Sequence, residues 1–345
     1  MKQRDLSLDI IRLLACAMVV MMHSPIPTDS ANGIILSTIS YLTTPCIGLF
    51  FMVSGALLLP PPISESESAL HYLRKRLSRV LTPTLVWTLF YIAVKQFADP
   101  APVGQMLKTV ISIPFSAQGH GVLWFIYTLV ALYLLTPILH AWLRVATEKD
   151  IRFYLLLWLI AMCYPILKMA VVTNDTATGI LYYFSGYVGY YMLGYWLQRY
   201  PDALLLKTAS ALMAISIAAP VAIKLAHIQV DFYEMFWYLS VFVVVQCVFW
   251  WKVVKRLCAA VTFSERTQRF ITICSNLSFG IYLSHIFIMR QGVWKLPFVE
   301  QLASMPLVQT IVVAIITLSV AIAFSWAVGI SPLGNAVVGW RYKRK

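Results

Sequence analysis

An arginine and a histidine stand eleven residues apart in the first apolar stretch of the chain. Residues 8–12 are Leu-Asp-Ile-Ile-Arg, and ten further residues separate Arg12 from His23. On an α-helix a step of eleven residues turns about 1100°, so both side chains lie on one face, about 16 Å apart along the axis. Ionisable groups inside a membrane span are costly, and they indicate function. The pair therefore predicts a polar stripe for a long, partly anionic molecule.

The composition indicates a protein with many membrane spans. Apolar residues make up 60% of the 345 residues, and charged residues make up 12%. A soluble domain has a more polar composition than this. The first apolar stretch contains Asp9 and Arg12 and is followed by Pro25 and Pro27 instead of a small-residue cleavage site. We therefore expect this stretch to remain in the protein as its first span.

At about 20 residues per crossing, we expect an all-α, polytopic membrane protein with about ten transmembrane helices. The spans are predicted at 6–24, 34–59, 81–98, 122–143, 151–171, 180–198, 204–226, 236–257, 272–290 and 305–329. The segment 64–80 is too charged to span, and it is predicted to be a cytoplasmic amphipathic helix at the membrane surface. Residues 1–345 would then form a single membrane-embedded domain.

The distribution of basic residues predicts the orientation. If the N-terminus is cytoplasmic, the cytoplasmic segments hold about 20 of the 27 lysines and arginines, as the positive-inside rule requires. An even number of spans returns the C-terminus to the cytoplasm. The net charge of +13 would then lie beside anionic lipid, and it does not indicate a nucleic-acid partner.

The sequence contains no pattern typical of a metal centre or a nucleotide-binding loop. Its six cysteines are scattered in or beside apolar stretches, without a Cys-x-x-Cys pair, and we expect them to fill helix interfaces. A Walker-type loop, a dinucleotide fingerprint and a Gly-x-Ser-x-Gly elbow are all absent from the sequence. We therefore expect neither a metal nor a tightly bound cofactor.

An ordered set of motifs resembles the acyltransferase-3 family, the bacterial membrane O-acyltransferases that modify cell-surface glycans. The motifs are Leu-Asp-Ile-Ile-Arg at 8–12 with His23, Phe-Phe-Met-Val-Ser-Gly at 50–55, the basic run 74–83, Leu-Trp-Phe at 123–125 with Tyr133 and Pro137, and Tyr-Leu-Ser-His at 282–285. The chain departs from the family pattern at one point. Many relatives have a histidine directly before Leu-Trp-Phe, whereas here two residues separate His120 from Leu123.

The resemblance implies an O-acyltransferase of the bacterial inner membrane, and most members are O-acetyltransferases. The donor substrate would be cytoplasmic acyl-CoA, most often acetyl-CoA, and the acceptor would be a hydroxyl of a cell-surface glycan or a lipid-linked saccharide. The protein would also contact membrane lipid. The resemblance leaves the acyl group, the sugar and the leaflet of transfer open.

Four arginines are expected to bind the donor. Arg12 would meet a phosphate or a pantetheine carbonyl of CoA with its guanidinium group. Arg74, Arg76 and Arg79 would either anchor the basic run at the membrane surface or dock the charged nucleotide end of CoA.

The remaining site residues are expected near the acyl group or in support of it. His23 would either take the proton of the acceptor hydroxyl or carry the acyl group itself. Asp9 is expected to pair with the arginine three residues further on or with a loop cation. Ser54 would permit close helix packing or touch the donor. Trp124 would lie at the membrane interface or line the acyl tunnel, and His285 would lie in a helix interface or at the acceptor mouth.

A transporter or flippase of an envelope glycan lipid is the alternative function, because it would also need many spans and a polar interior. Such proteins contain internal repeats with broken helices in both halves, and the sequence shows no clear repeat. The pair of Arg12 and His23, together with the ordered motifs, favours the enzyme.

Overall fold

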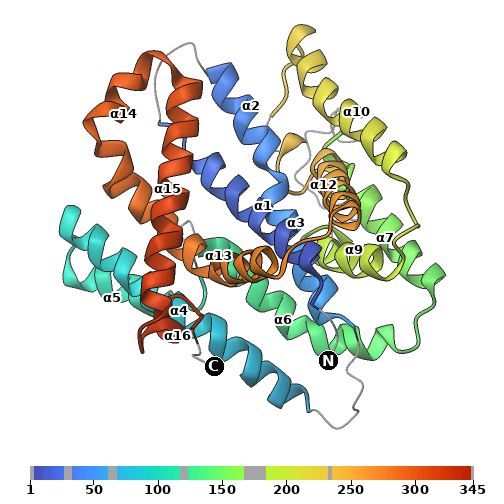
Figure 1. Ribbon diagram of the computed structural model, residues 1–345, viewed down its shortest axis with the longest axis horizontal. Coiled ribbons are helices and arrows are strands. Elements are labelled where there is room, and N and C mark those ends of the chain that lie inside the picture. Colours follow the sequence, from blue (N-terminus) through green and yellow to red (C-terminus); the bar gives the residue numbers. More distant parts are fainter. Residues whose placement is uncertain are drawn as a thin grey trace. The chain divides into compact units, whose positions relative to one another are not determined.

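The computed structural model describes residues 4–26, 33–60, 68–116, 123–166, 184–231 and 235–342, without the side chains of 33–36. Throughout these ranges the regular structure is helical and contains no strand (Figure 1). The chain divides into two compact units. Unit 1 consists of Met1–Met22, Gly33–Pro62 and Ile138–Ser275, and unit 2 of His23–Asn32, Ile63–Pro137 and Asn276–Lys345.

The described residues form the following α-helices, given in chain order. They are α1 (Leu6–His23), α2 (Gly33–Thr43), α3 (Pro45–Leu58), α4 (Ala69–Ala98), α5 (Val103–Ile111), α6 (Trp124–Leu143), α7 (Glu148–Met162), α9 (Val188–Arg199), α10 (Leu206–Leu225), α12 (Val241–Ala260), α13 (Glu265–Gln291), α14 (Pro297–Gln301), α15 (Pro306–Gly329) and α16 (Gly334–Val337).

Within the described residues, seven helical segments are long and apolar enough to cross a membrane. These segments are Leu6–His23, Ser37–Leu58, Ala69–Ala98, Trp124–Leu143, Leu206–Leu225, Glu265–Lys295 and Pro306–Gly329. Each of them overlaps a span predicted from the sequence, although Ala69–Ala98 begins twelve residues before the predicted span 81–98. The protein is therefore an all-α membrane protein, as its composition predicts.

The other three predicted spans, 151–171, 180–198 and 236–257, coincide with α7, α9 and α12. The described parts of α7 and α9 have 15 and 12 residues, which is short for a crossing of about 20 residues. The helix α12 has 20 residues but contains three basic side chains. The total of ten spans and the cytoplasmic placement of both termini thus stay predictions.

The basic run is part of a long helix. The helix α4 continues unbroken from Ala69 to Ala98, and the side chain of Ser68 caps it by accepting the N–H of His71. Residues 61–67, where the predicted amphipathic segment begins, lie outside the described part of the chain. The charged residues from 74 onward therefore form the first turns of the helix whose apolar part is the predicted third span.

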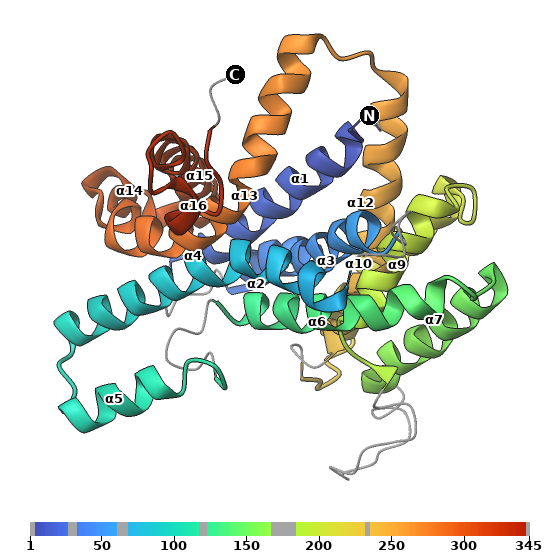
Figure 2. The ribbon, with the colours of Figure 1, turned by 90° about the horizontal axis from the view of Figure 1, so that it is seen from below.

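The core of unit 1 forms where α3 and α9 pack together, next to α12 (Figure 2). A Cβ atom added to Gly55 would collide with the carbonyl oxygen of Tyr191, and one added to Gly194 would collide with the carbonyl oxygen of Met52. The two backbones thus touch where each helix has a glycine. Small residues permit this close approach in membrane proteins, where helix packing replaces much of the hydrophobic driving force.

Unit 2 is organised around the second half of α13. Tyr91 of α4 donates a hydrogen bond of 2.8 Å to the carbonyl oxygen of Leu283, and Phe90 packs edge-on against Phe287 at a centroid distance of 4.9 Å. Trp87 donates a further hydrogen bond of 2.9 Å to the carbonyl oxygen of Val337. The contacts of Phe90 and Tyr91 fix the part of α13 that contains the Tyr-Leu-Ser-His motif, and the contact of Trp87 joins α4 to α16.

Replacing Gly55 with alanine will separate α3 from α9, because the added methyl group meets main-chain atoms that cannot rotate away. We expect a loss of stability of about 1–3 kcal/mol, as in other overpacked interiors. The measurement is the melting temperature of the protein in detergent. The control is Gly104→Ala on α5, where nothing lies within 4 Å of the added Cβ and alanine favours the helix. Equal melting temperatures for the two variants would contradict this account of the α3–α9 contact.

Candidate functional site

The buried carboxylate of Asp9 gathers polar side chains near the start of α1. It accepts hydrogen bonds of 2.6 and 2.7 Å from Arg4 and one of 2.7 Å from the hydroxyl of Ser275 on α13. Nη1 of Arg12 donates to the same hydroxyl over 3.3 Å. Ser275 therefore connects Arg12 to Asp9 within unit 1.

Of the two partners expected for Asp9, the described residues show a cation outside the helix and not Arg12. That cation is Arg4, just before α1, at 2.6 Å. An arginine that donates to both oxygens of a carboxylate forms one of the strongest charged contacts in proteins. Sequence analysis did not find Arg4 by name and missed Ser275, which lies on a distant segment of the chain.

Asp5 connects the beginning of α1 to two other helices of unit 1. Its carboxylate accepts a hydrogen bond of 2.7 Å from Lys255 on α12 and one of 2.9 Å from Gln198 on α9. Burial opposes the charged form and would raise the pKa of Asp5, but the hydrogen bonds from Lys255, Ser7 and Gln198 outweigh it and lower this pKa to about 2. The position of α1, and with it of Asp9, depends on this ion pair.

His23 and His285 lie beside each other in unit 2. Their ring centroids are 5.5 Å apart, and the ring planes are tilted by 44°. His23 is the last residue of α1 and is partly buried, whereas His285 is 1% exposed. The sequence predicted each histidine as a separate site residue, and the fold brings the two together.

The hydrogen bond of His285 determines which ring nitrogen has the proton. Nδ1 lies 2.6 Å from the carbonyl oxygen of Tyr282, and because a carbonyl only accepts, the neutral ring has its proton on Nδ1. Nε2 then has a lone pair. This atom is buried, and no hydrogen-bond partner for it is found among the described residues. A buried lone pair of this kind can take a proton from a hydroxyl group.

Two of the family-like motifs meet at the histidine pair. Phe125 of the Leu-Trp-Phe motif packs against Tyr282 at a centroid distance of 5.3 Å, and Tyr282 packs against His285 at 5.7 Å. Trp124, the first residue of α6, is partly buried. His120, where the chain departs from the family pattern, lies outside the described residues.

Arg290 adds a positive charge to this cluster. It lies on α13 near the end of the helix, and its charge acts on both His23 and His285. Its guanidinium group lies over the ring of Trp294 at 5.7 Å. Arg290 was not among the site residues predicted from the sequence.

The other predicted site residues have local surroundings of their own. The hydroxyl of Ser54 donates to the carbonyl oxygen of Phe50 in the same helix at 2.8 Å, which suits a packing role next to Gly55. On α4, Arg76 lies over the ring of Tyr72 at 5.8 Å. Its neighbours Arg74 and Arg79 are exposed, where an anionic ligand can reach them.

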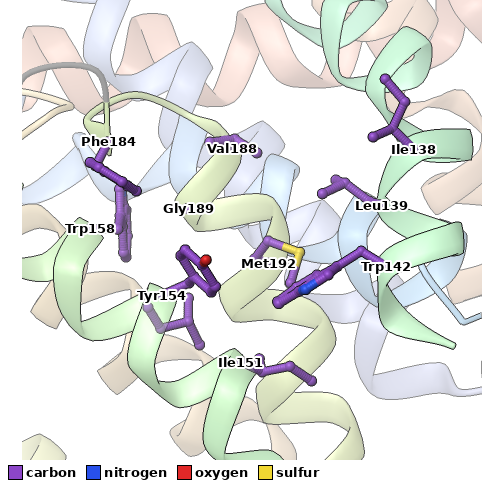
Figure 3. A pocket seen from close by; sticks show the side chains of 11 residues that line it. Ile138, Leu139, Trp142, Ile151, Tyr154, Trp158, Phe184, Val188, Gly189 and Met192 are labelled. Carbon is purple, nitrogen blue, oxygen red and sulfur yellow. The ribbon is translucent and has the colours of Figure 1, made fainter. Parts of the chain in front are cut away.

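An apolar pocket of about 380 Å³ opens in unit 1 between α6, α7 and α9 (Figure 3). Trp142, Tyr154 and Trp158 line it, together with aliphatic side chains, and none of the predicted site residues does so. Its lining contains no carboxylate, imidazole or cationic group, so this pocket offers no chemistry for acyl transfer. Across the described ranges, no cluster of three or more histidine, cysteine or acidic side chains could hold a metal ion.

A known protein family matches almost the whole length of the chain. Residues 5–326 match a family model described as an acyltransferase domain. No curated protein and no solved structure matches the chain. The family match includes every motif named above.

Replacing Asp5 with asparagine will remove the acid sensitivity that the ion pair with Lys255 produces. Because the pKa of folded Asp5 lies below its ordinary value of 3.8, the pair stabilises the fold above about pH 4, and this stabilisation is lost as the pH falls towards 2. We expect Asp5→Asn to melt at a lower temperature than the wild type at pH 7. Between pH 4 and pH 3 its melting temperature should fall less than that of the wild type. Thermal unfolding in detergent measures both effects.

The matched variants are Lys255→Gln and the double variant with Asp5→Asn. Since the two residues form one contact, the double variant should lose less stability than the sum of the two single losses. Additive losses would show that Asp5 and Lys255 act separately.

Proposed function

Because the chain belongs to the acyltransferase-3 family, we propose that it transfers an acetyl group from cytoplasmic acetyl-CoA to a hydroxyl of a cell-surface or lipid-linked glycan. In this reaction the sugar oxygen forms an ester bond with the acyl carbon, and the carbon–sulfur bond of the thioester breaks. The hydroxyl proton finally passes to the sulfur of CoA. The alternative of a flippase has no comparable support, since the match is to acyltransferases.

The histidine pair is the observation that supports this proposal most directly. Nε2 of His285 has an unshared lone pair inside unit 2, and the centroid of the His23 ring lies 5.5 Å from the centroid of the His285 ring. Two routes suit this arrangement. In one route His23 takes the proton of the acceptor hydroxyl, and in the other it carries the acyl group between donor and acceptor. In both, the second imidazole is placed to move a proton.

We propose that Arg12 binds the donor substrate, acetyl-CoA. Its guanidinium group would bind a phosphate or a carbonyl of CoA, and the hydrogen bond to Ser275, which also donates to Asp9, would hold it in position. The exposed arginines of α4, Arg74 and Arg79, with their neighbour Arg76, would meet the charged nucleotide. Trp124 would form part of the wall around the acyl group.

The orientation proposed from the basic residues gives the reaction a direction. With ten spans and both termini in the cytoplasm, Arg12 would face the cytoplasmic pool of acetyl-CoA. His23, at the opposite end of α1, would lie nearer the outer side of a bacterial inner membrane, where envelope glycans are modified. Acyl groups would thus pass from a cytoplasmic donor to an exported or lipid-linked acceptor.

Deleting the gene will remove acetyl groups from an envelope glycan, because the proposed enzyme is the source of that ester. Mass spectrometry of glycans from cells with and without the gene should show the loss of acetyl substituents. Complementation with the wild-type gene should restore them, whereas His23→Ala should not, although the protein reaches the membrane in normal amounts. The matched control is His227→Asn, at an exposed loop position, which should restore acetylation.

Two results would contradict the proposal. The first is unchanged acylation of every envelope glycan after deletion, with lipid-linked sugar accumulating on one leaflet, as expected of a flippase. The second is normal acetylation by the His23→Ala variant, which would remove His23 from the mechanism.

Replacing Arg12 with alanine will weaken the binding of acetyl-CoA. A hydrogen-bonded contact to a charged group contributes about 1.5–3 kcal/mol, so we expect the KM for acetyl-CoA to rise about tenfold or more, with a smaller effect on kcat. Initial rates at varied donor concentration, measured in membranes, separate the two constants. Arg12→Lys should recover part of the affinity, and Arg269→Ala, at an exposed position of α13, should leave KM unchanged. An unaltered KM in Arg12→Ala would exclude Arg12 from the donor site.

A further inference from the structure

A second apolar groove, of about 420 Å³, lies in unit 1 between α7, α9, α10 and α12. Its volume falls within the range of about 300–1,000 Å³ typical of sites for small molecules. The walls are almost entirely aliphatic, with leucines from α7, α9 and α10 and valines from α12. Such walls suit a hydrocarbon chain.

Two side chains give the groove a polar element. Arg152, near the start of α7, lines it and is largely exposed, and its guanidinium group lies 3.9 Å from Glu148. Trp196 lines the groove from α9. Its indole nitrogen is buried, and the described residues provide no acceptor for its N–H. The guanidinium group of Arg152 has five N–H donors and can bind a phosphate oxygen in addition to Glu148, and an anionic oxygen can also accept the N–H of Trp196.

The start of α10 is a third feature that favours an anionic ligand. Leu204 lines the groove just before this helix, and no side chain caps the first amides of α10. The N-terminus of a helix attracts phosphate groups through its free amides and its dipole. The groove thus combines apolar walls with a cation, a buried donor and a helix N-terminus.

We propose that this groove binds an anionic phospholipid of the surrounding bilayer. One acyl chain lies along the leucines of α7 and α10, the head-group phosphate meets Arg152, and an ester or phosphate oxygen accepts the N–H of Trp196. Basic pockets between membrane helices bind anionic head groups in this manner, and tryptophan favours the depth where head groups meet acyl chains. The lipid would fill the space between the pair α7–α9 and the pair α10–α12. This proposal does not depend on the acyl-transfer function.

The pocket of Figure 3 offers a place for the second acyl chain. Leu155 and Trp158 line both cavities, so the two adjoin along α7. Ile151 and Tyr154 line the first pocket, whereas Arg152 and Leu156 line the second groove. Since these residues form neighbouring stripes on one helix, a phospholipid at the start of α7 can direct one chain along each stripe.

The proposal is tested with purified protein in detergent, without acyl-CoA, to which dioleoylphosphatidylglycerol or dioleoylphosphatidylcholine is added. Native mass spectrometry counts the bound lipids, and thermal unfolding reports their effect. We expect the anionic lipid to bind more tightly and to raise the melting temperature, because a ligand of the folded state stabilises it. Arg152→Gln should weaken the binding of phosphatidylglycerol about fivefold, as expected for one cation near a head group.

Two further variants distinguish the contacts of the lipid's acyl chain from the contacts of its head group. Leu212→Trp fills the groove from a position on α10 that is 38% exposed, and it should reduce the binding of both lipids. Trp196→Phe removes the N–H together with part of the aromatic surface and should weaken the binding of both lipids equally. Arg269→Gln, on α13 outside the groove, should bind lipid as the wild type does.

Equal binding of the two lipids, or unchanged binding of phosphatidylglycerol in Arg152→Gln, would overturn the proposal. If Leu212→Trp does not fold, Arg152→Gln still decides the matter, because its side chain is 65% exposed and the substitution disturbs no packed core.

Discussion

Each charged or polar group inside a membrane protein needs a partner, because hydrocarbon offers none. The helix α1 contains Asp9, Arg12 and His23, and its place in the fold depends on the partners these groups find. Asp9 is 4% exposed and is paired with Arg4, while Ser275 of α13 bonds both Asp9 and Arg12. In unit 2, His23 of α1 stands against His285 of α13. The same two helices thus supply both polar clusters.

Close backbone contact supports these polar contacts in unit 1. Helices in lipid gain little from burying apolar side chains against one another, so they associate through packing and hydrogen bonds. The glycines at positions 55 and 194 let α3 and α9 touch, and α3 also contacts α12. Asp5 then joins the start of α1 to α9 and α12 through Gln198 and Lys255. The glycine contact therefore determines the frame to which the polar residues of α1 are attached.

Much of the helix pattern follows from local sequence. Runs of apolar residues predict spans because each crossing must satisfy its own backbone, and α1 and α15 agree with their predicted limits to within one residue. The segment 64–80 was predicted to be a helix at the membrane surface, and α4 is indeed helical from Ala69, continuing without a break into the predicted third span. The location of its first turns at the membrane surface stays a prediction. A count of charged residues also ignores the hydrogen-bond partners that allow a charged side chain to be buried. Lys252 of α12 is buried because it donates to the carbonyl oxygen of Pro201.

The site was only partly predictable for a related reason. Spacing along one helix places Arg12 and His23 on one face, and this inference requires no tertiary information. The contacts of Ser275 and Phe125 join segments that lie far apart in the chain. No pattern in a single sequence predicts such contacts, so Ser275 was missed.

The two histidines differ in a way that favours a division of work. His285 is fully enclosed, and its Nδ1 is tied to the carbonyl oxygen of Tyr282, so only Nε2 can exchange a proton and the ring cannot turn without losing that bond. His23 ends α1 just before Ser24 and Pro25, and its ring is only partly buried. A substrate that arrives at the pair therefore meets His23 more readily. The fixed ring is suited to hold or accept a proton, and the more accessible ring is suited to touch the acyl group or the acceptor hydroxyl, as both proposed routes require.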